Sequence, residues 1–252
     1  MYSQTDSLIK KISGFEKSMF PWKASRLKKG RPAFFLGCNL VNFLPATTYE
    51  AVKVLKTLDC GWIFDCCGKP LGLSGDSAGA MRILERIEFE IKRHEITEMI
   101  VACPNCHQVF RKNLSIPVTD IYHFLKREGY PIPMTSERIN VFTPCPDRGS
   151  KQIAGSIEAL TGNVLVGSGG LPCCGLGIRQ PARAKQALET IKQAAHEMKA
   201  YCASCYGHLS NNGINMTGHV LSEILGLEER PSAGVKKALN RLRPKLWQRG
   251  EK

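Results

Sequence analysis

Short apolar runs alternate with amphipathic stretches along the first half of this chain. The apolar runs predict buried strands at 33–36, 62–64 and 99–102. Between them, apolar residues recur every three or four positions, the period of a helix with one buried face. This spacing predicts helices from Thr48 (with Val52, Leu55 and Leu58 inside), from the N-cap Asp76 (with Met81, Leu84, Ile87 and Ile91 inside), from Pro104 and from Thr119.

The same order of elements returns in the second half. Strands are expected at 139–142, 164–166 and 198–201. Helices are expected over 153–160, after Pro181 with Ala184, Leu188, Ile191 and Ala195 on one face, and over 217–225, which repeats the helix from Thr119. Because strands and helices alternate throughout, the predicted fold class is α/β, with two similar repeats and parallel sheets.

Four segments follow from this pattern. Prolines 131 and 133 and a polar run mark the join between the repeats. The predicted divisions are a basic N-terminal extension (1–31), a first repeat (32–134), a second repeat (135–227) and a basic C-terminal tail (228–252).

Ten of the eleven cysteines fall into two matching sets. Each set contains a single cysteine, a Cys-Cys-Gly and a Cys-x-x-Cys: Cys38, Cys66, Cys67, Cys103 and Cys106 in the first, and Cys145, Cys173, Cys174, Cys202 and Cys205 in the second. In both sets 28 positions separate the first cysteine from the second. Only the middle spacing differs, by eight residues, which a loop or a longer helix would accommodate. Cys60 has no counterpart and is expected to be a small buried hydrophobe.

Each cysteine group is expected to follow a strand. Ligands of α/β proteins gather at the C-terminal ends of parallel strands, so cysteines far apart in sequence should converge there. Pro104 suits a first helical turn, whose free N–H groups stabilise a thiolate or a cluster. Gly68 and Gly175 should provide the turn that lets adjacent cysteines face one centre, and should let the backbone approach a bulky inorganic group.

Composition places this chemistry in a reducing compartment. The 252 residues are 43% hydrophobic and 23% charged, enough for a sizeable core. The chain has no apolar run of about 20 residues, and its first thirty residues lack a signal-peptide pattern. We therefore expect a cytoplasmic protein, associated with a membrane only through other subunits. Cytoplasmic thiols stay reduced, which favours metal or redox chemistry over a disulfide framework.

The net charge of +13 is concentrated at the two ends, which supply eleven of the thirteen charges. Solvated tails are one interpretation. The other is docking to an acidic partner subunit or an anionic membrane surface, helped by nearby apolar residues: Met19, Phe20, Trp22, Leu242, Leu246 and Trp247. Nucleic-acid binding is not expected, because no recognisable binding motif accompanies the basic residues.

Two other uses of the cysteines are open. Zinc prefers four tetrahedral ligands, and each set has five cysteines, one more than zinc needs. A thiol–disulfide enzyme would fit Cys103-Pro104-Asn105-Cys106 after a strand, but it would not require the other cysteines.

The histidines are weaker candidates. His107 and His208 lie close to Cys106 and Cys205 in sequence and are the two candidates for a proton donor or a hydrogen bond to cluster sulfur. The other four, His94, His123, His196 and His219, carry no signal.

The two sets resemble the CCG (cysteine-rich) domain, Cys-x(n)-Cys-Cys-Gly-x(n)-Cys-x-x-Cys, over residues 33–226. The tandem arrangement is similar to the B subunit of heterodisulfide reductase. It is also similar to the lactate-utilisation, glycolate-oxidase and anaerobic glycerol-3-phosphate dehydrogenase iron–sulfur subunits, and to the E-type subunit of some succinate:quinone reductases. The resemblance implies that each complete set of five cysteines holds one noncubane four-iron (4Fe–4S) cluster.

The resemblance implies one of two functions. As in heterodisulfide reductase, a substrate disulfide would be cleaved between the clusters, each accepting a sulfur while donating an electron. As in the dehydrogenase relatives, the clusters would instead relay electrons from a flavin subunit to a quinone or carrier. The ferredoxin domain of many relatives has no counterpart here, so electrons are expected from a ferredoxin-like or flavoprotein partner. Thr143 and Pro144 stand where relatives often have a histidine before the cysteine.

Overall fold

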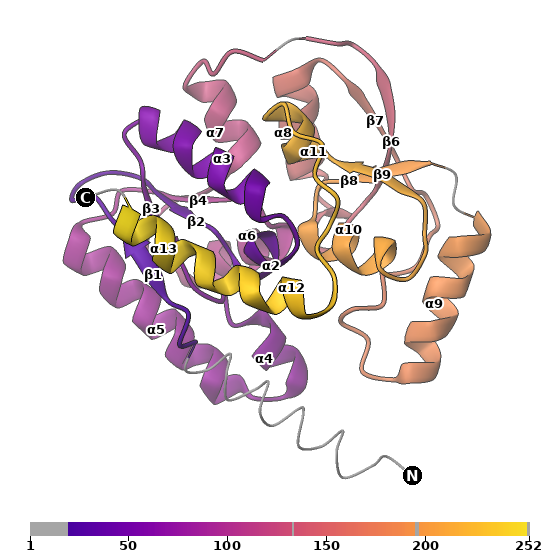
Figure 1. Ribbon diagram of the computed structural model, residues 1–252, viewed down its shortest axis with the longest axis horizontal. Helices are drawn as coiled ribbons and strands as arrows, with labels where there is room; N and C mark the ends of the chain where they lie inside the picture. Colours follow the sequence, from indigo (N-terminus) through magenta and orange to yellow (C-terminus); the bar gives the residue numbers. More distant parts are fainter. Residues whose placement is uncertain (1–19, 133, 195–196, 251–252) are drawn as a thin grey trace.

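Two α/β units make up the chain, each with its own sheet. The structure, a computed structural model, describes residues 20–132, 134–194 and 197–250. The first unit runs from indigo to magenta in Figure 1, and the second from pink to orange. Strands and helices alternate and all but one of the strand pairings are parallel, which confirms the predicted fold class.

The first sheet has five strands in the order β1–β3–β2–β4–β5. They are β1 (Ala24–Arg26), β2 (Ala33–Phe35), β3 (Gly61–Phe64), β4 (Met99–Val101) and β5 (Val118–Asp120). Strands β2 to β5 are parallel, and only β1 runs antiparallel, against β3. Every residue of β2, β3 and β4 is buried, as expected for parallel strands covered on both faces.

The second sheet repeats this plan with four parallel strands in the order β7–β6–β8–β9. They are β6 (Arg138–Phe142), β7 (Val164–Gly167), β8 (Met198–Ala200) and β9 (Met216–His219). The central strand β6 corresponds to β2, and both are followed by the first cysteine of their set. Internal duplication in the sequence is therefore matched by duplication of the strand order.

The helices follow the predicted order. The first unit contains α2 (Cys38–Phe43), α3 (Pro45–Thr57), α4 (Lys69–Ser74), α5 (Ser77–His94), α6 (Pro104–Asn113) and α7 (Ile121–Arg127). The second contains η1 (Cys145–Asp147), α8 (Gln152–Thr161), α9 (Pro181–Ala194), α10 (Ala203–Ser210) and α11 (Val220–Ile224). The chain ends with α12 (Gly234–Leu239), η2 (Asn240–Leu242) and α13 (Arg243–Gly250).

Several local predictions need correction. The helices expected from Thr119 and over 217–225 begin later, because β5 and β9 occupy their first residues. The helix expected from Thr48 begins at Pro45, and α2 precedes it. The N-cap of α5 is Asp76 as predicted, with its side chain accepting from the Gly79 N–H at 2.7 Å, but Met81 is 52% exposed and does not belong to the buried face. Ala195 lies outside the described residues.

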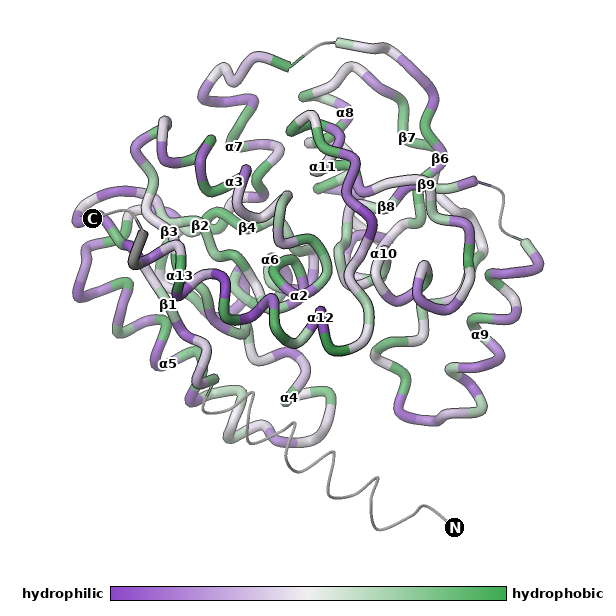
Figure 2. Tube along the Cα trace, in the orientation of Figure 1, coloured by the Kyte–Doolittle hydropathy of each residue, from purple (hydrophilic) through white to green (hydrophobic). Residues whose placement is uncertain are grey.

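The hydrophobic core is continuous across both units. Figure 2 shows hydrophobic residues concentrated along the inner strands and hydrophilic ones along outer helices such as α5. The two ends of the chain also pack on the first unit. Phe20 is buried against Phe64, and α13 lies along β1, so these basic segments are not wholly solvated tails. Met19 lies outside the described residues.

The two units face each other through their cysteine-bearing ends. Helix α2 contacts α10, and α7 contacts α8. At the second of these contacts, Ser156 on α8 donates to Asp120 at the end of β5 at 2.9 Å. Thr47 and Ser222 share a buried hydrogen bond of 2.7 Å beside the first contact. Among the described residues, no helix combines the length and the apolar character that crossing a bilayer requires.

Candidate metal centre

The structure places every cysteine group of the two sets after the end of a strand, with Cys106 and Cys205 in the first turns of α6 and α10. Cys38 opens α2 after β2, and Cys103 and Cys202 are the N-caps of α6 and α10 after β4 and β8. Cys66 and Cys67 follow β3, and Cys145 lies in η1 after β6; Cys173 and Cys174 lie in the loop after β7. The predicted location at the C-terminal ends of the strands is therefore confirmed.

Both Cys-Cys-Gly turns require glycine. Gly68 has a φ of 82° and Gly175 a φ of 94°, in the left-handed region. A Cβ at Gly68 would lie 3.1 Å from the carbonyl oxygen of Ala80, and one at Gly175 would lie 3.3 Å from that of Ala184. The Gly68 turn thus packs against the first turn of α5, and the Gly175 turn packs against the first turn of α9. The turning role predicted for these glycines is confirmed; their contact with a cofactor stays a prediction.

Thiol hydrogen bonds connect the first set. Cys38 donates to Cys66, and the thiols of Cys67 and Cys103 are close enough to act on Cys38. The Cys106 thiol lies within hydrogen-bonding reach of both Cys67 and Cys103. All five sulfurs of the first set therefore lie in one neighbourhood, although they come from three strand ends.

The second set is connected in the same way. Cys145 and Cys174 both donate to Cys173. The Cys205 thiol lies within hydrogen-bonding reach of both Cys174 and Cys202, which completes the set. The structure thus brings together all ten cysteines that the sequence grouped into two sets.

The two sets also touch each other. The Cys202 thiol donates to Cys103 across the boundary between the units. The Asn105 amide lies 3.9 Å from the Cys202 sulfur, and the Asn39 amide donates to Ser204 at 2.7 Å. Asn105 and Ser204 hold the same place in their Cys-x-x-Cys motifs. This position therefore makes a polar contact with the other unit in both motifs.

Two thiols have lowered pKa values, which favours their thiolate forms. Hydrogen bonds from Cys106 and Cys202 lower the pKa of Cys103 well below its usual value, and the N–H groups at the start of α6 act in the same direction. Hydrogen bonds from Cys145 and Cys174 lower the pKa of Cys173 to about 2, assisted by the Gly175 N–H and the Arg148 guanidinium. One anionic sulfur therefore lies in each set.

The sets differ in their access to solvent. Cys66, Cys67 and Cys106 are at most 4% exposed. Cys38 and Cys103 of the first set and Cys173 of the second are half-buried, and Cys145 of the second set is exposed. The second set is thus more open to solvent than the first, through Cys145 in η1.

The gathered thiols are the donor type of an iron–sulfur centre, because cysteine thiolates hold such clusters. Zinc also binds cysteine thiolates, four at a time, so the zinc interpretation stays open. Among the described residues, no three His, Cys, Asp or Glu side chains are arranged to hold a single metal ion.

The two histidine candidates have different surroundings. A Cβ at Gly175 would lie 3.6 Å from Nε2 of His208, and Cys173 acts electrostatically on the His208 ring, whose pKa is lowered by burial. His208 therefore lies at the second set. His107 is buried, with Nε2 lacking a hydrogen-bond partner, and the charged groups acting on it are Arg111 and Asp147. Asp147 belongs to η1 of the second unit, so His107 lies near the boundary between the two units.

Sequence reasoning missed two buried polar groups beside the Cys103–Cys202 contact. His219 is 1% exposed, both of its ring nitrogens lack hydrogen-bond partners, and Cys103 acts on it. The Tyr122 hydroxyl is also buried without a partner, and Cys202 and Cys103 act on it. A comparison of the repeats could have drawn attention to His219: it lies 17 positions after Cys202, as the buried Asp120 lies 17 after Cys103.

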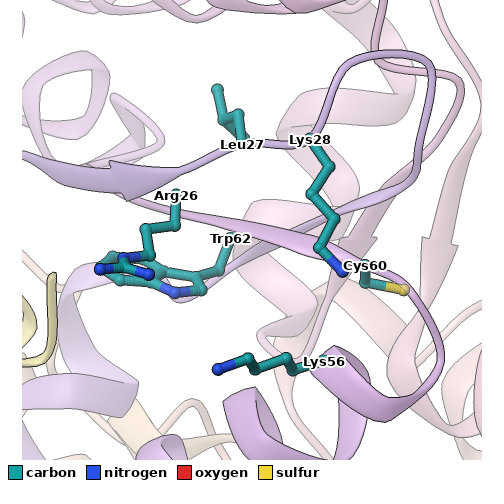
Figure 3. A pocket seen from close by; sticks show the side chains of 6 residues that line it. All are labelled: Arg26, Leu27, Lys28, Lys56, Cys60 and Trp62. Atoms are coloured by element: carbon teal, nitrogen blue, oxygen red, sulfur yellow. The ribbon is translucent and has the colours of Figure 1, made fainter. Parts of the chain in front are cut away.

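Cys60 lies at the other end of β3, away from the ten. It lines a surface pocket of about 360 Å³ with Arg26, Lys28, Lys56 and Trp62 (Figure 3). Burial raises the pKa of its thiol to about 12. Cys60 is 3% exposed, so the prediction of a small buried residue is confirmed.

Comparison with known proteins finds a family match within the first unit. Residues 32–111 match the family model of the CCG cysteine-rich domain. No curated protein matches the chain. Among solved structures, glutamate racemase from Campylobacter jejuni subsp. jejuni aligns over 88% of this chain and 99% of its own, at 13% identity and a TM-score of 0.36. A solute-binding protein of an ABC transporter system from Conexibacter woesei aligns over 77% and 69%, at 10% identity and a TM-score of 0.27. Likeness at these levels supports no inference about this chain.

Proposed function

We propose that the chain carries two noncubane-type 4Fe–4S clusters. Residues 32–111 match the family model of the CCG cysteine-rich domain, and the second unit repeats the strand order and cysteine order of the first. The coarser assignment, a protein of the iron–sulfur type, rests on the family match and the gathered cysteines. One cluster is assigned to Cys38, Cys66, Cys67, Cys103 and Cys106, and the other to Cys145, Cys173, Cys174, Cys202 and Cys205. Gly68 and Gly175 line the two positions.

The proposed reaction is the reduction of a disulfide. The observation that carries it is the contact between the two sets at Cys103 and Cys202, because splitting a disulfide takes two electrons and adjacent centres deliver them to one place. When bound, the clusters would supply one-electron transfers. The substrate S–S bond breaks, and two electrons and two protons convert it to two thiols. The electrons come from a ferredoxin-like or flavoprotein partner.

Residues of the second set are suited to the substrate side. Cys145 and Cys173 are the accessible members, so a substrate sulfur can approach there. His208 lies beside Cys173 and can hold a proton for a product thiol. Arg148 also acts on Cys173; its guanidinium donates to the carbonyl oxygens of Thr143 and Pro172 at 3.2 and 2.8 Å. That position lets it stabilise an anionic sulfur.

Electron relay is the second candidate function. The enclosure of the first set favours it, because electrons reach a buried centre without direct contact between substrate and sulfur. In this version the two clusters form a path between a flavin subunit of a hydroxyacid or glycerol-3-phosphate dehydrogenase and a quinone or carrier. The chain would then bind partner proteins on both sides and no disulfide.

Anaerobic purification tests the cofactor assignment. We expect a brown protein with about eight irons and a similar amount of sulfide per chain. About four irons would leave one set without a cluster, and zinc without iron would overturn the assignment. The reduced protein is then mixed with small disulfides while its visible absorbance is followed. Oxidation by a disulfide, with release of two thiols, supports reduction; oxidation only by a quinone supports relay.

A further inference from the structure

The end of the chain presents apolar side chains to solvent. Helices α12 and α13, joined by η2, form one helical segment over residues 234–250. Four apolar residues in it are exposed: Val235 (75%), Leu239 (58%), Leu242 (40%) and Leu246 (61%). They are separated by four, three and four positions, so with about 3.6 residues per turn they line one face. We call these four residues the apolar stripe.

The opposite face of the segment is held against the first unit through a hydrogen bond, a ring–ring contact and a cation–ring contact. Asn240 is buried and donates to the Asn42 carbonyl oxygen at 2.9 Å. The ring of Trp247 lies 5.1 Å from that of Tyr49, and the Lys237 ammonium lies 5.2 Å from the centre of the Phe43 ring. The orientation of the segment is therefore set by the fold. Its outward face is the apolar one, the reverse of a typical surface helix.

Basic residues border the apolar stripe on one side. Lys236 and Arg243, seven positions apart, lie there, whereas Lys245 on the other side donates to the Pro21 carbonyl oxygen at 2.6 Å. The sequence from 230 to 250 contains no Asp or Glu, and residues 234–250 contain six basic residues: Lys236, Lys237, Arg241, Arg243, Lys245 and Arg249. Figure 2 shows hydrophobic and hydrophilic residues alternating along α12 and α13.

We propose that the apolar stripe docks on the surface of an anionic lipid bilayer, with the segment lying in the plane of the headgroups. A narrow apolar face beside a row of cations is the pattern of an interfacial helix, because the leucines enter the acyl boundary while Lys236 and Arg243 reach anionic headgroups. An acidic protein groove would need carboxylates along that rim and a closely fitted floor. The lipid surface needs neither, and the inference does not depend on the cluster assignment.

Co-sedimentation with vesicles tests this inference. The full chain is mixed with phosphatidylcholine vesicles containing about one-third phosphatidylglycerol, and with vesicles of phosphatidylcholine alone. We expect binding to the anionic vesicles, weakened by added salt because the cations contribute through screened charge interactions. The double variant Leu239→Glu, Leu246→Glu should bind at least about tenfold more weakly. Both side chains are exposed, so circular dichroism should show an unchanged fold.

A matched control is available on α5. Phe89 is 62% exposed and lies outside the stripe, so Phe89→Glu should bind as the wild type does. Failure of the wild-type chain to bind anionic vesicles overturns the inference, as does unchanged binding by the double variant. A dimer in sedimentation velocity that the double variant abolishes would overturn it in favour of a second copy. Binding to polyglutamate as tight as to the vesicles, unaffected by the double variant, would overturn it in favour of an acidic protein partner.

Discussion

The thiol of Cys202 donates a hydrogen bond to Cys103, which lies 99 positions earlier in the chain and in the other unit. Both residues are N-caps of the helix that follows the equivalent strand, β4 or β8. The duplicated units therefore meet at the same structural position in each copy. This contact joins the two cysteine sets, and the proposed two-electron chemistry depends on it.

Removing one cysteine should affect one set only. Cys67→Ser and Cys174→Ser should each reduce the iron content from about eight to about four, because each residue hydrogen-bonds within one neighbourhood of sulfurs. Iron and sulfide analysis after anaerobic purification measures this. The control is Cys60→Ser, whose thiol lies at the opposite end of β3 and should leave the iron content unchanged. Loss of all iron from either cluster variant would mean that the two sets bind metal as one unit.

Cys173 and Cys60 should react with iodoacetamide very differently in the metal-free protein. The pKa of Cys173 is lowered to about 2, so the thiolate is present throughout the neutral range and its alkylation rate should change little between about pH 6 and 8. The pKa of Cys60 is raised to about 12 by burial, so Cys60 should stay unmodified while the fold is intact. Peptide mass spectrometry over time measures both sites. A Cys173 rate that rises about tenfold per pH unit would contradict the thiolate assignment.

Two glycine substitutions only four residues apart should have opposite effects on stability. Gly68→Ala puts a Cβ at a φ of 82° and 3.1 Å from the Ala80 carbonyl oxygen, so we expect a loss of about 1–2 kcal/mol in the free energy of unfolding. Gly72→Ala lies in α4 with open space around its Cβ and should stabilise by about 0.5–1 kcal/mol. Urea titration of the metal-free protein compares them. A neutral Gly68→Ala would show that the Cys-Cys-Gly turn tolerates side chains.

His219 should make the metal-free protein sensitive to acid. Burial lowers its pKa to about 3, so below its unfolded pKa of about 6.5 the unfolded state binds a proton that the folded state does not, and stability falls as the pH falls. Going from pH 7.5 to 5.5, this one residue should cost about 1.4 kcal/mol. Between these two pH values, the free energy of unfolding of His219→Phe should fall by about 1.4 kcal/mol less than that of the wild type. Urea unfolding at both pH values measures this. His123→Gln, at an exposed position on α7, should follow the wild type; equal slopes for all three proteins would show that His219 is charged in the fold.

The turn before Cys66 should depend on Arg86. Asp65 is 1% exposed and accepts two hydrogen bonds from the Arg86 guanidinium, at 2.8 and 2.7 Å, besides one from the Cys66 N–H. Arg86→Ala leaves a buried carboxylate without its cation, and we expect a loss of about 3 kcal/mol. Arg93→Ala, exposed on the same helix, should change stability by less than about 1 kcal/mol. Thermal or urea unfolding separates the two outcomes, and equal small effects would contradict the buried pair.

The duplication made most of the fold predictable. Strands β2, β3, β4, β6, β7 and β8 contain apolar runs that stand out in the sequence, and each was predicted within a few residues. Strands β5 and β9 contain Thr119 and Thr217 in polar surroundings beside a helix, so a three- or four-residue strand carries too little periodicity to be separated from it. Strand β1 forms by antiparallel pairing with β3, and the residue pattern of 24–26 alone does not predict that pairing.

The site was predictable where spacing alone determines it. The repeated cysteine order predicted which sulfurs gather, and the strand ends predicted where. The contact between Cys103 and Cys202 was not predictable, because it depends on how the two units pack. For the same reason His219 appeared to be an ordinary packed residue, and Arg148, three positions after Cys145, was overlooked as a surface cation although it acts on Cys173.

The return of the C-terminal segment onto α2 has a consequence for biosynthesis. Asn240 binds the Asn42 carbonyl, Ser232 donates its N–H to the Phe43 carbonyl at 2.9 Å, and Ser204 holds Asn39, the neighbour of Cys38. These partners of α2 leave the ribosome long after Cys38 does. The helix that begins at Cys38 therefore gains these contacts only after the last helices have been made.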